Sequence, residues 1–255
     1  MKTLEEKALT ILLAMDTANQ NMAARDFALS LASRLKAEII GLIIEDENLL
    51  LSTQYPFASE IVFGSAAERK LDYSNMERSL RAWSTQTQNQ LLLRAKRANI
   101  KCSFRTFRGR TTETFLEQSE SASLLVFSGT RISQFQSRPR SYTAYILVDD
   151  NTEIQNSLTI VNQLKTEGIN HIVFIDSGEQ QSQKNLDLAI QSLTKAGLQS
   201  QIKKLKNDLP QQLAIIVRNQ PAAVVMVPAT HHIIQQTQLF RELQNYLSCP
   251  VLVVK

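Results

Sequence analysis

The sequence predicts an α/β fold made of two doubly wound parallel-sheet units in tandem. Three observations predict it: strands that are apolar along their whole length, amphipathic helices between them, and a repetition of this series in the second half of the 255 residues. Continuous apolar runs indicate strands buried on both faces, as in parallel sheets. Their alternation with helices predicts helices on both faces of the sheet.

The first unit is expected to span residues 1–140. Its strands are expected at 10–15, 38–44, 101–108 and 123–127, and its helices at 17–36, 72–98 and 111–120. The strand 101–108 alternates in polarity and carries Lys and Arg, which suits a sheet edge. Between Phe127 and Tyr145 the chain is too short for a helix, a loop and a fifth strand. Strand 123–127 is therefore expected to be covered by the second unit or by a second chain.

The second unit is expected to span residues 141–255. Its strands are expected at 142–148, 171–175, 201–206, 223–227 and 249–254, and its helices at 153–165, 183–196, 209–219 and 233–247. The boundary falls near residues 133–143, where Gln, Ser, Arg and Pro139 interrupt the apolar pattern.

Composition predicts a reduced, cytoplasmic globular protein. Apolar residues make up 43% of the chain and charged residues 20%, which is usual for a soluble protein with a full core. No run approaches the ~18–20 apolar residues of a membrane span. The first apolar run stops at Asp16, which argues against a signal peptide. The two cysteines, Cys102 and Cys249, form no disulfide framework.

At this point the chain resembles the universal stress protein family in its tandem form. The resemblance rests on five segments taken in order: 11–16 (ILLAMD), 36–44 (KAEIIGLII), 107–109 (FRG), 124–129 (LLVFSG) and 249–254 (CPVLVV). It implies a strand order of 3-2-1-4-5 in each unit, which places strands 101–108 and 201–206 at edges. A rival interpretation, a phosphorylated response-regulator receiver in the second half, requires a central third strand, and 201–206 is too polar for that position.

The resemblance also implies a ligand crevice at the carboxyl ends of the strands, where some family members bind ATP. In those members an Asp after strand one contacts the adenosine, and a loop with the pattern G-x2-G-x9-G-[ST] after strand four wraps the phosphates. The candidate ligand-binding residues here are Asp16, Gly129, Thr130, Arg131 and Asp149. Ile132 stands at the second glycine position, and the second unit has Pro228 where a loop should donate N–H groups. We therefore expect no cofactor, and weak ATP binding at most.

Residues 78–112 contain no acidic residue and are rich in Lys and Arg. A nucleic-acid surface would have this composition, but so would a solvated helix face followed by a protected edge strand. The sequence pI of about 9.1 is modest. We therefore do not expect nucleic acid as a partner, and we keep a role of residues 78–110 in binding it as the further alternative.

The sequence shows no constellation for catalysis and no metal site. His231 and His232 lack visible His, Cys or carboxylate partners at a fixed spacing, so an exposed pair is expected. Buried thiols are the expectation for both cysteines. The chain is therefore not expected to be an enzyme, although slow nucleotide hydrolysis belongs to the nucleotide-binding alternative below.

Residues 46–70 resemble an insertion into the first unit and contain several aromatic and aliphatic residues. Its position after the second strand predicts a lid over the crevice near Asp16 and Gly129, with Tyr55, Phe57, Ile61 and Phe63 buried. A partner-binding element on a long connection is an equal alternative.

The functional hypothesis is a non-catalytic cytoplasmic regulatory or stress-response protein. It would act through contacts with another protein, through self-association or through a small ligand. The alternative is an adenine-nucleotide-binding protein with slow hydrolysis. Sequence alone identifies neither the partner nor the ligand.

Overall fold

The computed structural model describes residues 9–16, 22–61, 66–109, 115, 117, 122–128, 142–165, 169–178, 181–205, 209–218 and 223–255. In the first part of the chain the order is β1 (Thr10–Asp16), α1 (Met22–Leu35), β2 (Glu38–Asp46), α2 (Glu47–Ser52), β3 (Ser59–Ile61), β4 (Glu68–Lys70), α3 (Tyr73–Arg97), β5 (Cys102–Gly109) and β6 (Leu124–Phe127). The predicted helix 111–120 is described only at Phe115 and Glu117, which are helical.

The second part contains β7 (Tyr142–Val148), α5 (Gln155–Leu164), β8 (Ile169–Asp176), α6 (Gln181–Lys195), β9 (Gln199–Lys204), α7 (Leu209–Arg218), β10 (Ala223–Pro228), α8 (His232–Gln235), α9 (Thr237–Tyr246) and β11 (Val251–Val254). The helix expected at 233–247 is divided at Gln236, where the backbone leaves the helical region.

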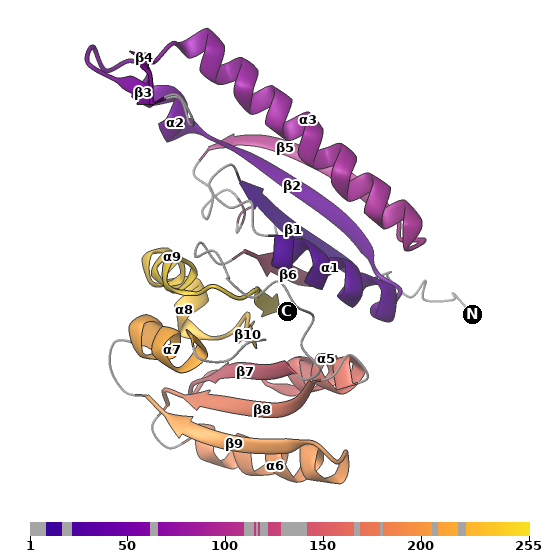
Figure 1. Cartoon of the computed structure of the whole chain (residues 1–255). Coiled ribbons are helices and arrows are strands. Elements are labelled where there is room, and N and C mark those ends of the chain that lie inside the picture. Colours follow the sequence, from indigo (N-terminus) through magenta and orange to yellow (C-terminus); the bar gives the residue numbers. More distant parts are fainter. Residues whose placement is uncertain are drawn as a thin grey trace.

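One sheet joins the strands of both units in the order β5-β2-β1-β6-β11-β10-β7-β8-β9 (Figure 1). Each half therefore has the expected order 3-2-1-4, with a fifth strand, β11, only in the second. The alternating strands β5 and β9 lie at the two edges, as predicted. A receiver would place β9 in the centre of its half, so the rival interpretation is excluded.

Within the main sheet the two halves are joined by one antiparallel strand pair, and every other strand pair described in that sheet is parallel. β11 pairs with β10 in parallel and with β6 in antiparallel, with Leu252 opposite Val126. The expectation that strand 123–127 is covered by the second unit is confirmed. Because β6 and β11 are buried throughout, this pairing merges two apolar edges into the middle of the sheet.

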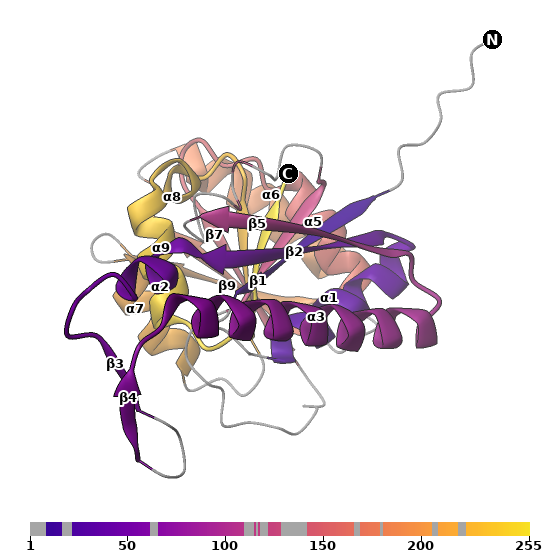
Figure 2. The same cartoon turned by 90° about the horizontal axis from the view of Figure 1, so that it is seen from above.

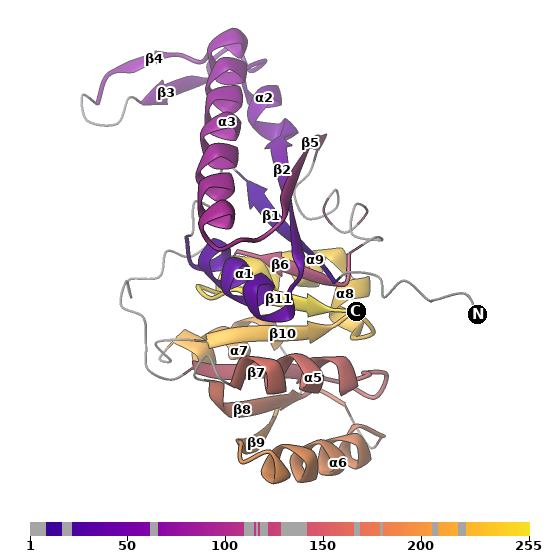
Figure 3. The ribbon, with the colours of Figure 1, turned by 90° about the vertical axis from the view of Figure 1, so that its right-hand side faces the viewer.

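Helices cover both faces of this sheet. Helices α1, α3, α5 and α6 contribute to the apolar core on one face, and α1 contacts both α3 and α5 (Figure 3). Helices α7, α8 and α9 pack on the other face, together with Phe115. Leu124, Val126 and Leu252 belong to the first of these cores, which runs without interruption across the junction of the two halves.

The insertion leaves the body of the protein instead of folding over it. After α2, residues 53–61 and 66–70, which we call the arm, contain the two-stranded antiparallel sheet β3-β4 and project away from the main sheet (Figure 2). Phe63, whose burial was also expected, lies outside the described residues. Tyr55, Phe57 and Ile61 are 69%, 96% and 74% exposed. The predicted lid is therefore wrong for these residues, because α2 and the long helix α3 carry the arm past the end of the sheet.

Candidate functional site

The first unit places Asp16 at the end of β1, opposite Ile44 of β2. This is the carboxyl end of the parallel strands, as expected for the crevice. The candidates Gly129, Thr130 and Arg131 lie outside the described residues, and so do the loop residues that follow Asp16. The proposed ligand site of the first unit therefore stays a prediction.

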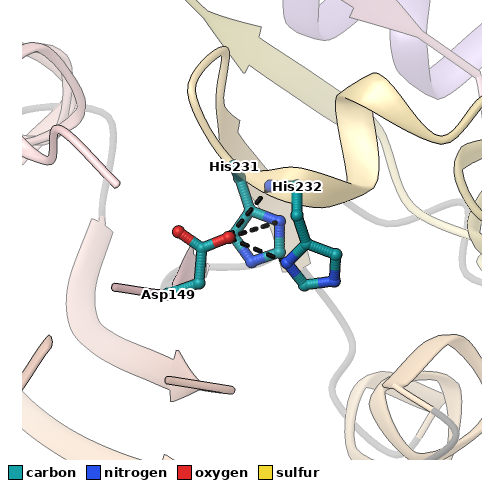
Figure 4. Close-up of side chains that lie close together, drawn as sticks. All are labelled: Asp149, His231 and His232. Carbon is teal, nitrogen blue, oxygen red and sulfur yellow. Dashed lines mark hydrogen bonds and ion pairs between the residues drawn. The ribbon is translucent and has the colours of Figure 1, made fainter. Parts of the chain in front are cut away.

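The second unit gathers Asp149, His231 and His232 at the carboxyl ends of two neighbouring strands (Figure 4). Asp149 directly follows β7, and the two histidines follow β10, which pairs with β7 in parallel. One ligand atom from each residue lies within 4.8 Å of the other two. The sequence expectation that the histidines lack a carboxylate partner is therefore wrong.

Hydrogen bonds to both of its oxygens hold the Asp149 carboxylate in place. Its Oδ1 accepts hydrogen bonds from the Thr152 hydroxyl at 2.6 Å and the Asn151 N–H at 3.0 Å. Its Oδ2 accepts the His232 N–H at 2.9 Å and lies 2.8 Å from His232 Nδ1. Burial raises the pKa of this carboxyl, but the bonds from His232 and Thr152 outweigh burial and bring the pKa to about 2.

His231 is fully buried, contrary to the expected exposed pair, whereas His232 keeps 38% of its side chain exposed. The Nδ1 atom of His231 accepts the Ile233 N–H at 3.2 Å and so caps α8. Its Nε2 atom has no hydrogen-bond partner among the described residues. Burial lowers the pKa of His231 to about 4, against the opposing charge of Asp149, and keeps the ring neutral at pH 7.

A further hydrogen bond joins the loop after β7 to the loop after β10. The hydroxyl of Thr230 accepts the Glu153 N–H at 3.0 Å, which joins the start of the segment before α5 to the loop after β10. In the second unit the expected crevice is therefore bridged by the protein's own polar groups. Parallel neighbours end at one edge of a sheet, so the order 3-2-1-4-5 together with the positions of Asp149 and His231 could have predicted this cluster.

The basic stretch is partly neutralised by acidic residues from elsewhere in the chain. Arg81 pairs with Glu77, Arg94 pairs with Asp26, and Arg108 lies 3.2 Å from Glu45. A groove follows one side of α3, and it is lined by Arg78, Arg81, Ala82, Thr85, Gln86, Asn89, Gln90 and Leu93. This groove lies on the helix, not at the carboxyl ends of the strands.

The cysteines do not add a nucleophile to the candidate site. Cys249 is buried, and burial raises the pKa of its thiol to about 12. Cys102 is half-buried, and burial raises its pKa to about 11. Both groups are therefore protonated at neutral pH and unreactive.

No protein-family model matches the sequence, and no curated protein matches it either. Among solved structures, the chain is similar to a universal stress protein from Archaeoglobus fulgidus, with 11% identity over 96% of both chains and a TM-score of 0.55. It is also similar to a universal stress protein family member from Burkholderia pseudomallei (15% identity, 78% of this chain and 97% of that one, TM-score 0.32). A third similar structure is the cytoplasmic domain of a prokaryotic cation chloride cotransporter (10%, 97% and 95%, TM-score 0.41).

The first of these similarities shows that the chain has the fold of a universal stress protein. It confirms the fold that the sequence resemblance implied. Among the described helices, none has the length and hydropathy that crossing a membrane requires.

Proposed function

We propose that the protein is a non-catalytic regulatory protein of the stress-response type, which acts through protein contacts made by the arm. The observation that supports this proposal is the exposure of Tyr55, Phe57 and Ile61 on a segment that projects from the body. A two-stranded sheet is marginally stable alone in water, and the exposed aromatic residues that precede it favour a protein partner.

The arm is built to hold its shape without burying these side chains. Arg69 pairs with Glu60 across the two strands, and the Ser59 hydroxyl donates to Glu68. Below the arm, Leu50 of α2 is buried and α2 contacts both α3 and β5. The base is thus anchored by apolar packing, while Tyr55, Phe57 and Ile61 of the arm are exposed.

Replacing both Tyr55 and Phe57 with serine is expected to remove the protein contacts without lowering stability, because both side chains are exposed. Sedimentation velocity measures self-association, and chemical cross-linking in cells of the source organism measures other partners. The control is the double variant Leu188→Ser/Ile215→Ser, which alters exposed apolar residues on α6 and α7. If the arm variant keeps all the contacts of the wild type, or if the control loses them equally, the proposed role of the arm is wrong.

The nucleotide-binding alternative predicts that the protein binds ATP. We expect instead that ATP binds weakly or not at all. In the second unit both oxygens of Asp149 already accept hydrogen bonds from the chain, so a ribose hydroxyl would compete with Thr152 and His232. In the first unit Ile132 also replaces the second glycine of the phosphate-binding loop, and in the second unit no glycine follows Gly197. Isothermal titration with Mg-ATP is expected to show no saturation in the low micromolar range, and an affinity in that range would favour the alternative.

A further inference from the structure

We propose that Asp149, His231 and His232 form a binding site for one transition-metal ion of the zinc class. The three side chains come from two loops that are far apart in the sequence, and they bring two imidazoles and a carboxylate together. These are the nitrogen and oxygen ligands that Zn²⁺ and Co²⁺ take in proteins. The site is independent of the arm and of the function proposed for it.

The spacing of the ligand atoms suits such an ion. Ligands at about 2.0–2.1 Å from a tetrahedral zinc ion lie roughly 3.3 Å from one another. The Oδ2 atom of Asp149 lies 2.8 Å from His232 Nδ1 and 3.8 Å from His231 Nδ1. These two distances bracket the required value, and one ligand atom of each of the three residues lies within 4.8 Å of the other two. Rotations of the side chains would then bring three ligand atoms around one ion.

Residues outside the cluster orient the carboxylate. The Thr152 hydroxyl and the Asn151 N–H both bond Oδ1, which leaves Oδ2 directed at the histidines. Such outer contacts are a regular feature of metal sites, where they fix the direction of the ligand atoms. The Thr152 hydroxyl in turn accepts the Asp149 N–H, so the loop is closed around the ligand.

His231 and His232 have different roles in this site. His231 is fully buried, its Nε2 has no described partner, and its Nδ1 makes only a 3.2 Å bond to the Ile233 N–H, which the ion would displace. His232 is partly exposed and stacks on His231, with ring centroids 4.5 Å apart. The ring of His232 can therefore rotate and give the ion access from solvent, and it would bind the metal through Nδ1 as the neutral imidazole that carries its proton on Nε2.

The test uses the purified, chelator-treated chain and Co²⁺ or Zn²⁺ as the probe. Isothermal titration is expected to show one ion per chain, and His232→Gln is expected to weaken binding tenfold or more. The control is His171→Gln, which removes the third histidine of the chain from β8 and is expected to leave the affinity unchanged. Mg²⁺ is expected not to compete, because two of the three ligands are imidazoles.

Two further measurements make the result specific. Asp149→Asn is expected to weaken binding as His232→Gln does, with circular dichroism confirming that both variants are folded. The visible absorption of bound Co²⁺ is expected to show nitrogen and oxygen ligation without thiolate bands. Absence of saturable binding to the wild type, unchanged affinity in His232→Gln, or equal weakening in His171→Gln would overturn the proposal.

Discussion

Replacing Leu252 with alanine is expected to destabilise both halves of the protein together, by about 2–5 kcal/mol in the free energy of unfolding. Leu252 is fully buried in β11 and lies between Met226 of β10 and Val126 of β6. Removing its side chain would leave a cavity at the place where the two halves share one core. The effect should therefore extend to the first half, although the substitution lies in the last strand of the second half.

The only tryptophan, Trp83, makes this expectation measurable. It lies on α3 in the first half and packs against the core that includes Leu252. In a urea titration the midpoint seen by Trp83 fluorescence should fall as far as the midpoint seen by far-UV circular dichroism. Leu188→Ala is the control, because that side chain is 58% exposed and its loss should change stability by less than about 0.5 kcal/mol.

Different urea midpoints from Trp83 fluorescence and from circular dichroism would contradict this expectation. If Trp83 kept the wild-type midpoint while part of the dichroism signal moved, the two halves would unfold independently. The pairing of β6 with β11 would then contribute little to the stability of the first half.

The fold was predictable from sequence because its signals are local and repeated. Continuous apolar runs such as Ile39–Ile44 indicate buried strands, and the polar alternation of β5 and β9 indicates edges. The short connection after Phe127 also indicated the missing fifth strand. These patterns arise because each strand position is either buried or exposed, and the same positions are buried in any protein of this architecture.

The arm was not predictable by the same reasoning. Burial of Tyr55, Phe57 and Ile61 was expected because apolar side chains usually leave water, and the nearest apolar surface was taken to be the crevice. In the structure Asp46 caps α2, whose Leu50 packs at the base, and the direction set there carries the arm outward. Which apolar side chains stay exposed is not contained in the local hydrophobic pattern.

The candidate site was predicted only in part. Asp149 was among the candidate ligand-binding residues, but its contacts with His231 and His232 depend on how β7 and β10 align across 83 residues of sequence. Adjacent histidines at the start of a short helix gave no sign that one would be buried and the other exposed. That difference arises from the Ile233 N–H, which holds the ring of His231 inward.

Lowering the pH from 6.5 to 4 is expected to destabilise the protein through His231. Burial lowers the pKa of this group from 6.5 to about 4, so in this range the unfolded chain binds a proton that the folded chain does not. The free energy of unfolding therefore keeps its full value above pH 6.5 and falls progressively as the pH is lowered to 4. A difference of this size corresponds to about 3 kcal/mol in the free energy of unfolding.

The variant His231→Asn isolates this contribution. Asparagine is a favourable N-cap residue, and its side-chain oxygen can accept the Ile233 N–H in place of the ring. Urea titrations in chelator-containing buffer should show that the smaller side chain lowers the free energy of unfolding by the same amount at every pH. Between pH 6.5 and 4 the free energy of unfolding of this variant should fall little further. His171→Asn, on β8, should retain the wild-type dependence on pH.

The region below pH 4 provides an internal check on the same measurement. There Asp149, with its pKa lowered from 3.8 to about 2, loses its contribution as it gains a proton. This second loss should appear in both proteins, because the bonds from His232 and Thr152 remain, and it should be smaller in His231→Asn, which lacks the contribution of His231 to the lowered pKa of Asp149. If His231→Asn kept the full wild-type loss between pH 6.5 and 4, another group would be responsible for it, and the buried neutral state of His231 would be refuted.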